Sequence, residues 1–73
     1  SDGEFLGELC RNACRHYAAV EEALREVRGL CPFPDFVDPV DDALVARATS
    51  CLRRARDEES LGLNWLGRLY YNL

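Results

Sequence analysis

The 73-residue sequence contains no lysine, isoleucine, glutamine or methionine, and it has one histidine and one tryptophan. All nine basic residues are therefore arginines, which pair bidentately with carboxylates and stack on aromatic rings, and so suit interfaces better than lysines. No apolar run approaches the ~20 residues that a membrane-spanning helix requires, and we expect no membrane partner. The short length predicts a single helical domain, residues 1–73. Because methionine is absent, we expect this domain to be excised from a larger protein.

Positive charge is also scarce. Thirteen acidic residues outnumber the nine arginines, and the net charge is -4. A chain of this sign has no general attraction for nucleic-acid phosphates or anionic lipids. The most basic stretch, residues 47–56, is followed directly by three acidic side chains, so it is better interpreted as a solvated helix face than as a nucleic-acid-binding stripe. We predict no nucleic-acid partner.

The residue patterns of catalysis and cofactor binding are missing as well. The single histidine, His16, has no Ser–His or Cys–His spacing that one helix could bring together. The sequence has no phosphate-binding glycine loop, no EF-hand loop and no Cys-x2-Cys pair. His16 lies two residues from Cys14 and so points to another face of a helix, which argues against a zinc site. We predict no enzyme, no cofactor and no metal site.

What the sequence does contain is helical periodicity, which is strongest in its first third. Apolar residues there step alternately by four and three, the spacing of one face of a helix. They are Leu6, Cys10, Ala13, Tyr17, Val20, Leu24, Val27 and Cys31. We predict one long helix from Glu4 to Arg28, with Glu8 and Arg11 paired on its outer face. Gly29 and the prolines that follow it predict a turn.

A second helix is predicted from Pro39 to Asp57, with Asp38 as its N-cap. Its outer face offers two i,i+4 pairs of opposite charge, Arg53 with Asp57 and Arg54 with Glu58. The polar residues 57–60 are interpreted as a break, after which a third segment runs to the end of the chain. The predicted fold is therefore all-α, a small helical bundle in which an antiparallel helical hairpin is joined by a shorter third helix.

Whether the four cysteines can form disulfides indicates the cellular compartment of the protein. On a continuous helix Cys10 and Cys31 would be about 31 Å apart, far beyond the ~7 Å between bridged Cα atoms. A turn near Phe33 would place Cys51 opposite Cys14 or Cys10, so a single Cys14–Cys51 disulfide is allowed but two disulfides are not. We therefore predict reduced thiols in an intracellular protein, cytoplasmic or nuclear. The alternative is a secreted, disulfide-stabilised helical ligand or toxin-like peptide.

Aromatic residues mark the predicted binding surface. Two phenylalanines lie between and after the prolines of the turn, where a stiff loop loses little entropy on docking. The C-terminal segment carries apolar residues on more than one side, including the only tryptophan. The predicted partner-binding residues are Phe33, Phe36, Trp65, Leu69, Tyr70 and Tyr71. The competing interpretation is that they pack within the bundle. We predict a protein–protein interaction module, a helical scaffold or adaptor domain that binds a partner helix or forms a homo-oligomer.

Overall fold

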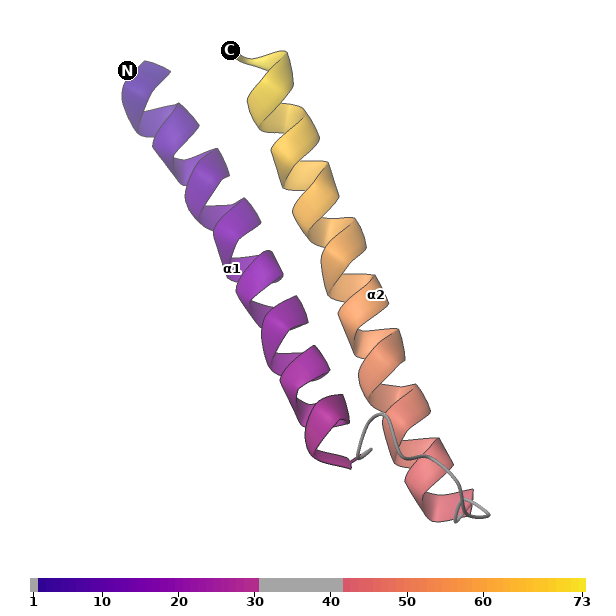
Figure 1. Cartoon of the computed structure of the whole chain (residues 1–73). Coiled ribbons are helices and arrows are strands. Elements are labelled where there is room, and N and C mark those ends of the chain that lie inside the picture. Colours follow the sequence, from indigo (N-terminus) through magenta and orange to yellow (C-terminus); the bar gives the residue numbers. More distant parts are fainter. Residues whose placement is uncertain (1, 31–41) are drawn as a thin grey trace.

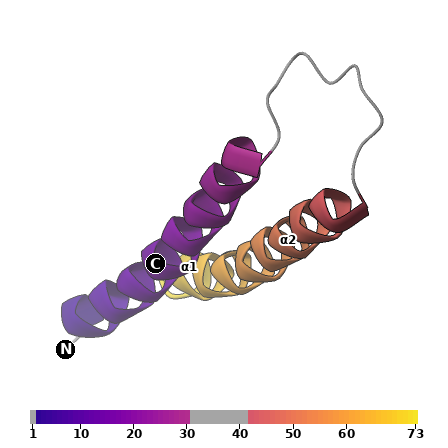
Figure 2. The ribbon, with the colours of Figure 1, turned by 90° about the horizontal axis from the view of Figure 1, so that it is seen from below.

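The computed structural model describes residues 2–30 and 42–73, which form two long helices. Helix α1 comprises Asp2–Leu30 and helix α2 comprises Asp42–Tyr71. They lie antiparallel, with both chain termini at the same end of an elongated molecule that measures 56 × 15 × 14 Å (Figure 1). Seen from below, no other described segment covers either side of the pair (Figure 2). The predicted all-α helical hairpin is therefore confirmed.

The first helix is one uninterrupted rod, as its periodicity predicted. Its first turn carries Asp2 and Glu4 and its last turn carries Arg28, which matches the partial charges at the two ends of a helix. The predicted pair of Glu8 with Arg11 is present, with 3.0 Å between Oε2 and Nη2. Both side chains are well exposed, so this pair adds little to stability.

The second half of the chain is one helix where two were predicted. Helix α2 continues without interruption through residues 57–60, and the shorter third helix is not present in the described residues. Helix propensity permits this continuation, because the polar run contains neither glycine nor proline and its glutamates favour a helix. Glu58 also keeps the spacing of the buried face of α2. The predicted starting residues of this helix, Asp38 and Pro39, lie outside the described part of the chain.

The two helices meet along a seam, which we define as the positions that step by three and four residues and are buried or half-buried. Helix α1 contributes Leu6, Leu9, Ala13, His16, Val20, Ala23, Val27 and Leu30. Helix α2 contributes Leu44, Ala48, Cys51, Ala55, Glu58, Gly62, Trp65 and Leu69. Both sets repeat every seven residues, which is the pattern of an antiparallel coiled coil. Leu9 is the largest fully buried side chain, so the core is built mainly from small residues.

The seam only partly follows the stripe predicted for α1. From Leu6 to Val27, every second predicted position lies in the seam and the positions between them are shifted by a single residue, while Cys31 lies outside the described residues. Cys10 is exposed and the neighbouring Leu9 is buried, while Tyr17 is half-buried beside the seam residue His16. Adjacent helical residues lie about 100° apart around the axis. The buried face of α1 is therefore rotated relative to the predicted one, toward a side that includes the histidine.

Contacts between the helices fix their relative register. Gly62 lies so close to Tyr17 that a Cβ atom added to the glycine would fall 3.0 Å from Cε2 of the tyrosine ring. On the other side of the seam, Arg54 of α2 is paired with Glu26 of α1. This interhelical pair replaces the predicted pairing of Arg54 with Glu58.

Helix α2 ends in a hydrogen-bonded cap. The side-chain Nδ2 of Asn72 donates to the carbonyl oxygen of Arg68 at 2.7 Å, and the backbone amide of Asn72 donates to the carbonyl oxygen of Leu69 at 3.1 Å. These bonds satisfy carbonyl groups that the end of a helix would otherwise leave without partners. The aromatic C-terminal turn is therefore an ordered part of α2.

Candidate interaction surface

Helix α2 carries a second heptad stripe beside the seam, and neither of the two described helices covers this one. We call it the outer stripe; it steps alternately by four and three residues from Val45 to Leu73. Its members are Val45, Thr49, Leu52, Arg56, Glu59, Leu63, Leu66, Tyr70 and Leu73. Apart from the half-buried Thr49 and Leu66, they are all exposed. Exposed apolar residues that recur at heptad spacing are typical of a helix that packs against a second partner.

The two flanks of the seam on α2 differ in character. The flank opposite the outer stripe carries Arg47, Arg54, Leu61 and Arg68. On that side Arg54 pairs with Glu26, and the hydrogen bond and charge of the guanidinium hold the pKa of the Glu26 carboxyl below its usual value. The same pairing raises the pKa of Arg54. Charge thus collects on one flank of the hairpin, and apolar side chains collect on the other.

The predicted partner-binding residues of α2 fall into two groups. Trp65 and Leu69 are half-buried members of the seam, and the guanidinium of Arg68 lies over the indole ring at 4.5 Å from its centroid. Tyr70 and Tyr71 are exposed, at 71% and 94%. The structure therefore places the first two in the interhelical packing and leaves the two tyrosines accessible. The other two predicted residues, Phe33 and Phe36, lie outside the described residues.

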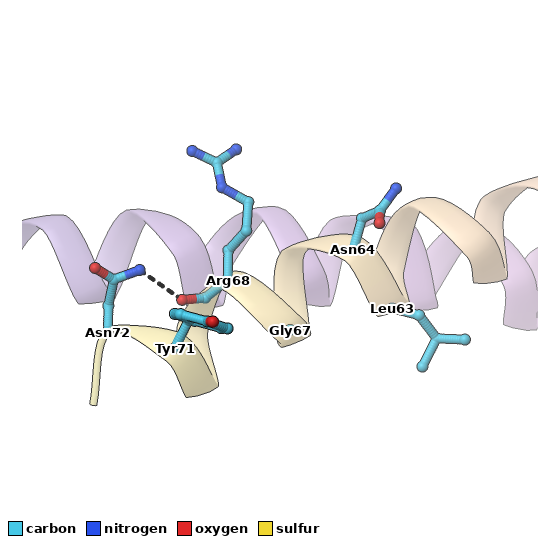
Figure 3. Close-up of a pocket in the computed structure, with 6 residues that line it drawn as sticks. All are labelled: Leu63, Asn64, Gly67, Arg68, Tyr71 and Asn72. Carbon is cyan, nitrogen blue, oxygen red and sulfur yellow. Dashed lines mark hydrogen bonds between the residues drawn. The ribbon is translucent and has the colours of Figure 1, made fainter.

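A shallow depression of about 460 Å³ lies on the C-terminal part of α2 (Figure 3). It is lined by Leu63, Asn64, Gly67, Arg68, Tyr71 and Asn72, all from this one helix. In Figure 3, Leu63 points away from Asn64 and Arg68, so the lining groups do not converge on a common point. Small-molecule sites are usually concave and bring polar groups together. The depression does not have this arrangement.

The cysteines in the described segments are free thiols. Cys10 and Cys14 are exposed on α1, whereas Cys51 is buried in the seam, where its thiol helps to lower the pKa of the Glu26 carboxyl. Glu26 lies 12 residues beyond Cys14, about 18 Å along the helix. The structure therefore does not bring the predicted Cys14–Cys51 pair together, because the seam register differs from a hairpin that turns near Phe33. Within residues 2–30 and 42–73, no three His, Cys, Asp or Glu side chains are grouped to hold a metal ion.

Comparison with known proteins supplies no relative: no family model, curated protein or solved structure matches this chain. Neither α1 nor α2, the two helices of the described segments, has an apolar stretch long enough to cross a membrane.

The sequence also carries a signal for the outer stripe. Leu63 and Leu73 are exposed and Leu66 is half-buried, and all three lie in the segment for which the sequence predicts a third helix. Their spacing relative to Tyr70 has the same three-and-four rhythm as a core face. Two such rhythms overlap in the second half of the chain, and only the position of α1 shows which of them is covered.

Proposed function

We propose that this chain is a protein-interaction module that binds an α-helix along the outer stripe of α2. The observation that carries the proposal is a heptad stripe that is exposed at seven of its nine positions, on a helix whose seam is already occupied. Heptad spacing matches the ridges and grooves of another helix, whereas it does not match the two-residue repeat of a strand.

The energetics favour a helical partner for this surface. Leu52, Leu63 and Leu73 are between 49% and 81% exposed. Burial of a leucine that starts fully exposed contributes about 1.5 to 3 kcal/mol, so three partly exposed leucines contribute only a few kcal/mol. A stable complex therefore also needs the other apolar residues of the stripe to offset the entropic cost of association. The hairpin itself has a core of mostly small side chains. A partner on the outer stripe would add the large apolar contacts that this core lacks.

Site-specific photo-crosslinking tests the proposal. A benzoylphenylalanine at position 70, in the outer stripe, should form a discrete adduct with a helical segment of a protein in cells that naturally express the chain. The same residue at position 53, on the exposed outward face of α2, is the matched control and should form none. Adding Leu63→Ser to the position-70 variant should abolish the adduct while circular dichroism shows unchanged helix content. Equal adducts from positions 53 and 70, or none from either, would exclude the outer stripe as an interface.

A further inference from the structure

We infer that the helix bound by the outer stripe is α2 of a second copy of this chain, packed antiparallel about a two-fold axis. This inference rests on the proposed function and names its partner. In a two-fold interface the same surface appears on both sides, so each residue i that contacts residue j must be matched by j contacting i. The outer stripe satisfies that condition from Val45 to Tyr70, whereas Leu73 has no symmetry mate within the stripe.

The middle of the stripe carries its only charges, Arg56 and Glu59. With the two-fold axis between them, Arg56 of one copy lies opposite Glu59 of the partner, and the reverse pair forms at the same time. The same alignment places Leu52 opposite Leu63 of the partner subunit. Further from the axis, Thr49 meets Leu66 and Val45 meets Tyr70, each with its symmetry mate. Opposite charges meet at the centre, and mostly apolar side chains meet on both sides of them.

The charges also select this register over its neighbours. Sliding one helix by a heptad in either direction places Arg56 opposite Leu66 or opposite Leu52 of the partner. Either slip would desolvate a guanidinium against an apolar side chain without a compensating carboxylate. Among residues 2–30 and 42–73, Arg56 has only a long contact to its neighbour Asp57, 3.5 Å between Nη2 and Oδ1, and both side chains are largely exposed. Arg56 is therefore available for a stronger partner.

The first helix fits the same arrangement. Tyr17 and Leu24 each directly follow a seam residue of α1, and both are half-buried. The Glu26–Arg54 pair lies on the opposite flank, so these two side chains share the flank of the outer stripe. The contacts of Tyr17 with Gly62 and of Glu26 with Arg54 place the two-fold axis between Tyr17 and Leu24 along α1. The dimer is then a four-helix bundle whose α1 helices also face one another.

Charge reversal across the axis tests the inference on the full chain. Sedimentation equilibrium should show a wild-type dimer. Arg56→Glu and Glu59→Arg each place like charges opposite one another twice per dimer, and each should weaken dimerisation by about tenfold or more. The double variant Arg56→Glu/Glu59→Arg should recover the wild-type dissociation constant. An equimolar mixture of the two single variants should form a heterodimer, because every cross-axis pair is then of opposite sign.

The control is Arg53→Glu, which makes the same charge change on the outward face of α2 and should leave dimerisation unchanged. Circular dichroism of each variant checks that the helices persist. A wild-type chain that remains monomeric at several hundred micromolar, or single variants that dimerise like the control, would overturn the inference. If that monomer still forms a position-70 adduct with a different protein, the proposed function stands and only the second copy is excluded. If the monomer forms no position-70 adduct either, both the proposed function and the dimer are excluded.

Discussion

His16 of α1 and Glu58 of α2 face one another across the seam, with 2.6 Å between Nδ1 and Oε2. The two side chains are 23% and 28% exposed, and they lie 42 residues apart in the sequence. The neighbouring seam positions are apolar residues or glycine. A single polar pair in such a seam penalises any slip of one helix along the other, because a slip would leave both groups without a partner.

Replacing one member of this pair should destabilise the hairpin. His16→Leu leaves the Glu58 carboxylate largely covered and without its hydrogen-bond partner, and we expect the free energy of unfolding to fall by about 1 to 2 kcal/mol. The double variant His16→Leu/Glu58→Leu should return to wild-type stability or exceed it, since apolar side chains of similar volume often replace a buried polar pair without loss. Urea unfolding at one fixed protein concentration measures both. A single variant as stable as the wild type would show that the pair has no structural role.

The Glu26–Arg54 pair should make stability depend on pH. The pKa of Glu26 lies below its usual value of 4.5, chiefly because Arg54 donates a hydrogen bond to the carboxylate and attracts its charge. A carboxyl whose pKa is lower in the folded than in the unfolded state stabilises the fold above the unfolded pKa. This contribution disappears as the pH falls through the folded pKa. Arg54→Gln should therefore be less stable than the wild type at pH 7, and the difference should vanish at strongly acidic pH.

Arg53→Gln provides the control for that comparison, because it removes the same charge from the neighbouring exposed position. Its stability relative to the wild type should change little over the same pH range. A difference between wild type and Arg54→Gln that persists unchanged into acid would mean that Arg54 acts by packing and not by holding the carboxylate.

The sequence predicts α1 well because its helical signals agree: heptad spacing, no interior proline, and charges of the correct sign at each end. It does not predict the continuity of α2, because residues 57–60 look like a polar loop when read alone. The reason that Glu58 can occupy the seam is His16, and this partner lies in the other helix. A local sequence pattern does not show which distant residues will pair. The polar run 57–60 therefore predicts a break between two helices.

The candidate surface was predictable only in part for a related reason. Tyr70 and Tyr71 were selected as aromatic anchors, and the structure leaves both exposed. Trp65 was selected by the same criterion, yet it lies in the seam. Residue type alone cannot separate a core position from a flanking one when the two stripes lie about a quarter of a turn apart. The contacts that orient α1 on α2 supply the missing information.

Substitution by alanine should affect the stability of the protein differently at the two interior glycines of α2. Gly67 has no heavy atom within 4 Å of an added Cβ, so Gly67→Ala should raise stability by about 0.8 to 1 kcal/mol through helix propensity. At Gly62 the added Cβ would meet the Tyr17 ring at 3.0 and 3.1 Å, and the ring would have to shift by a few tenths of an ångström. Gly62→Ala should therefore be less stable than Gly67→Ala by about 1 to 3 kcal/mol. Equal gains at the two positions in thermal unfolding would exclude close packing of Tyr17 on Gly62.

The thiols offer a test of the register that is independent of stability. Cys14 is exposed and should react with iodoacetamide in the native protein at the rate of an unfolded peptide. Cys51 is 5% exposed, so its alkylation should require opening of the seam and should accelerate strongly in urea. Peptide mass spectrometry resolves the two sites. A mild oxidant should not join Cys14 to Cys51 under native conditions, because the seam places Cys51 beside Glu26. Rapid formation of that disulfide would require α2 to be shifted along α1 by about three turns, and the contacts of Gly62 and Arg54 described above could not then exist.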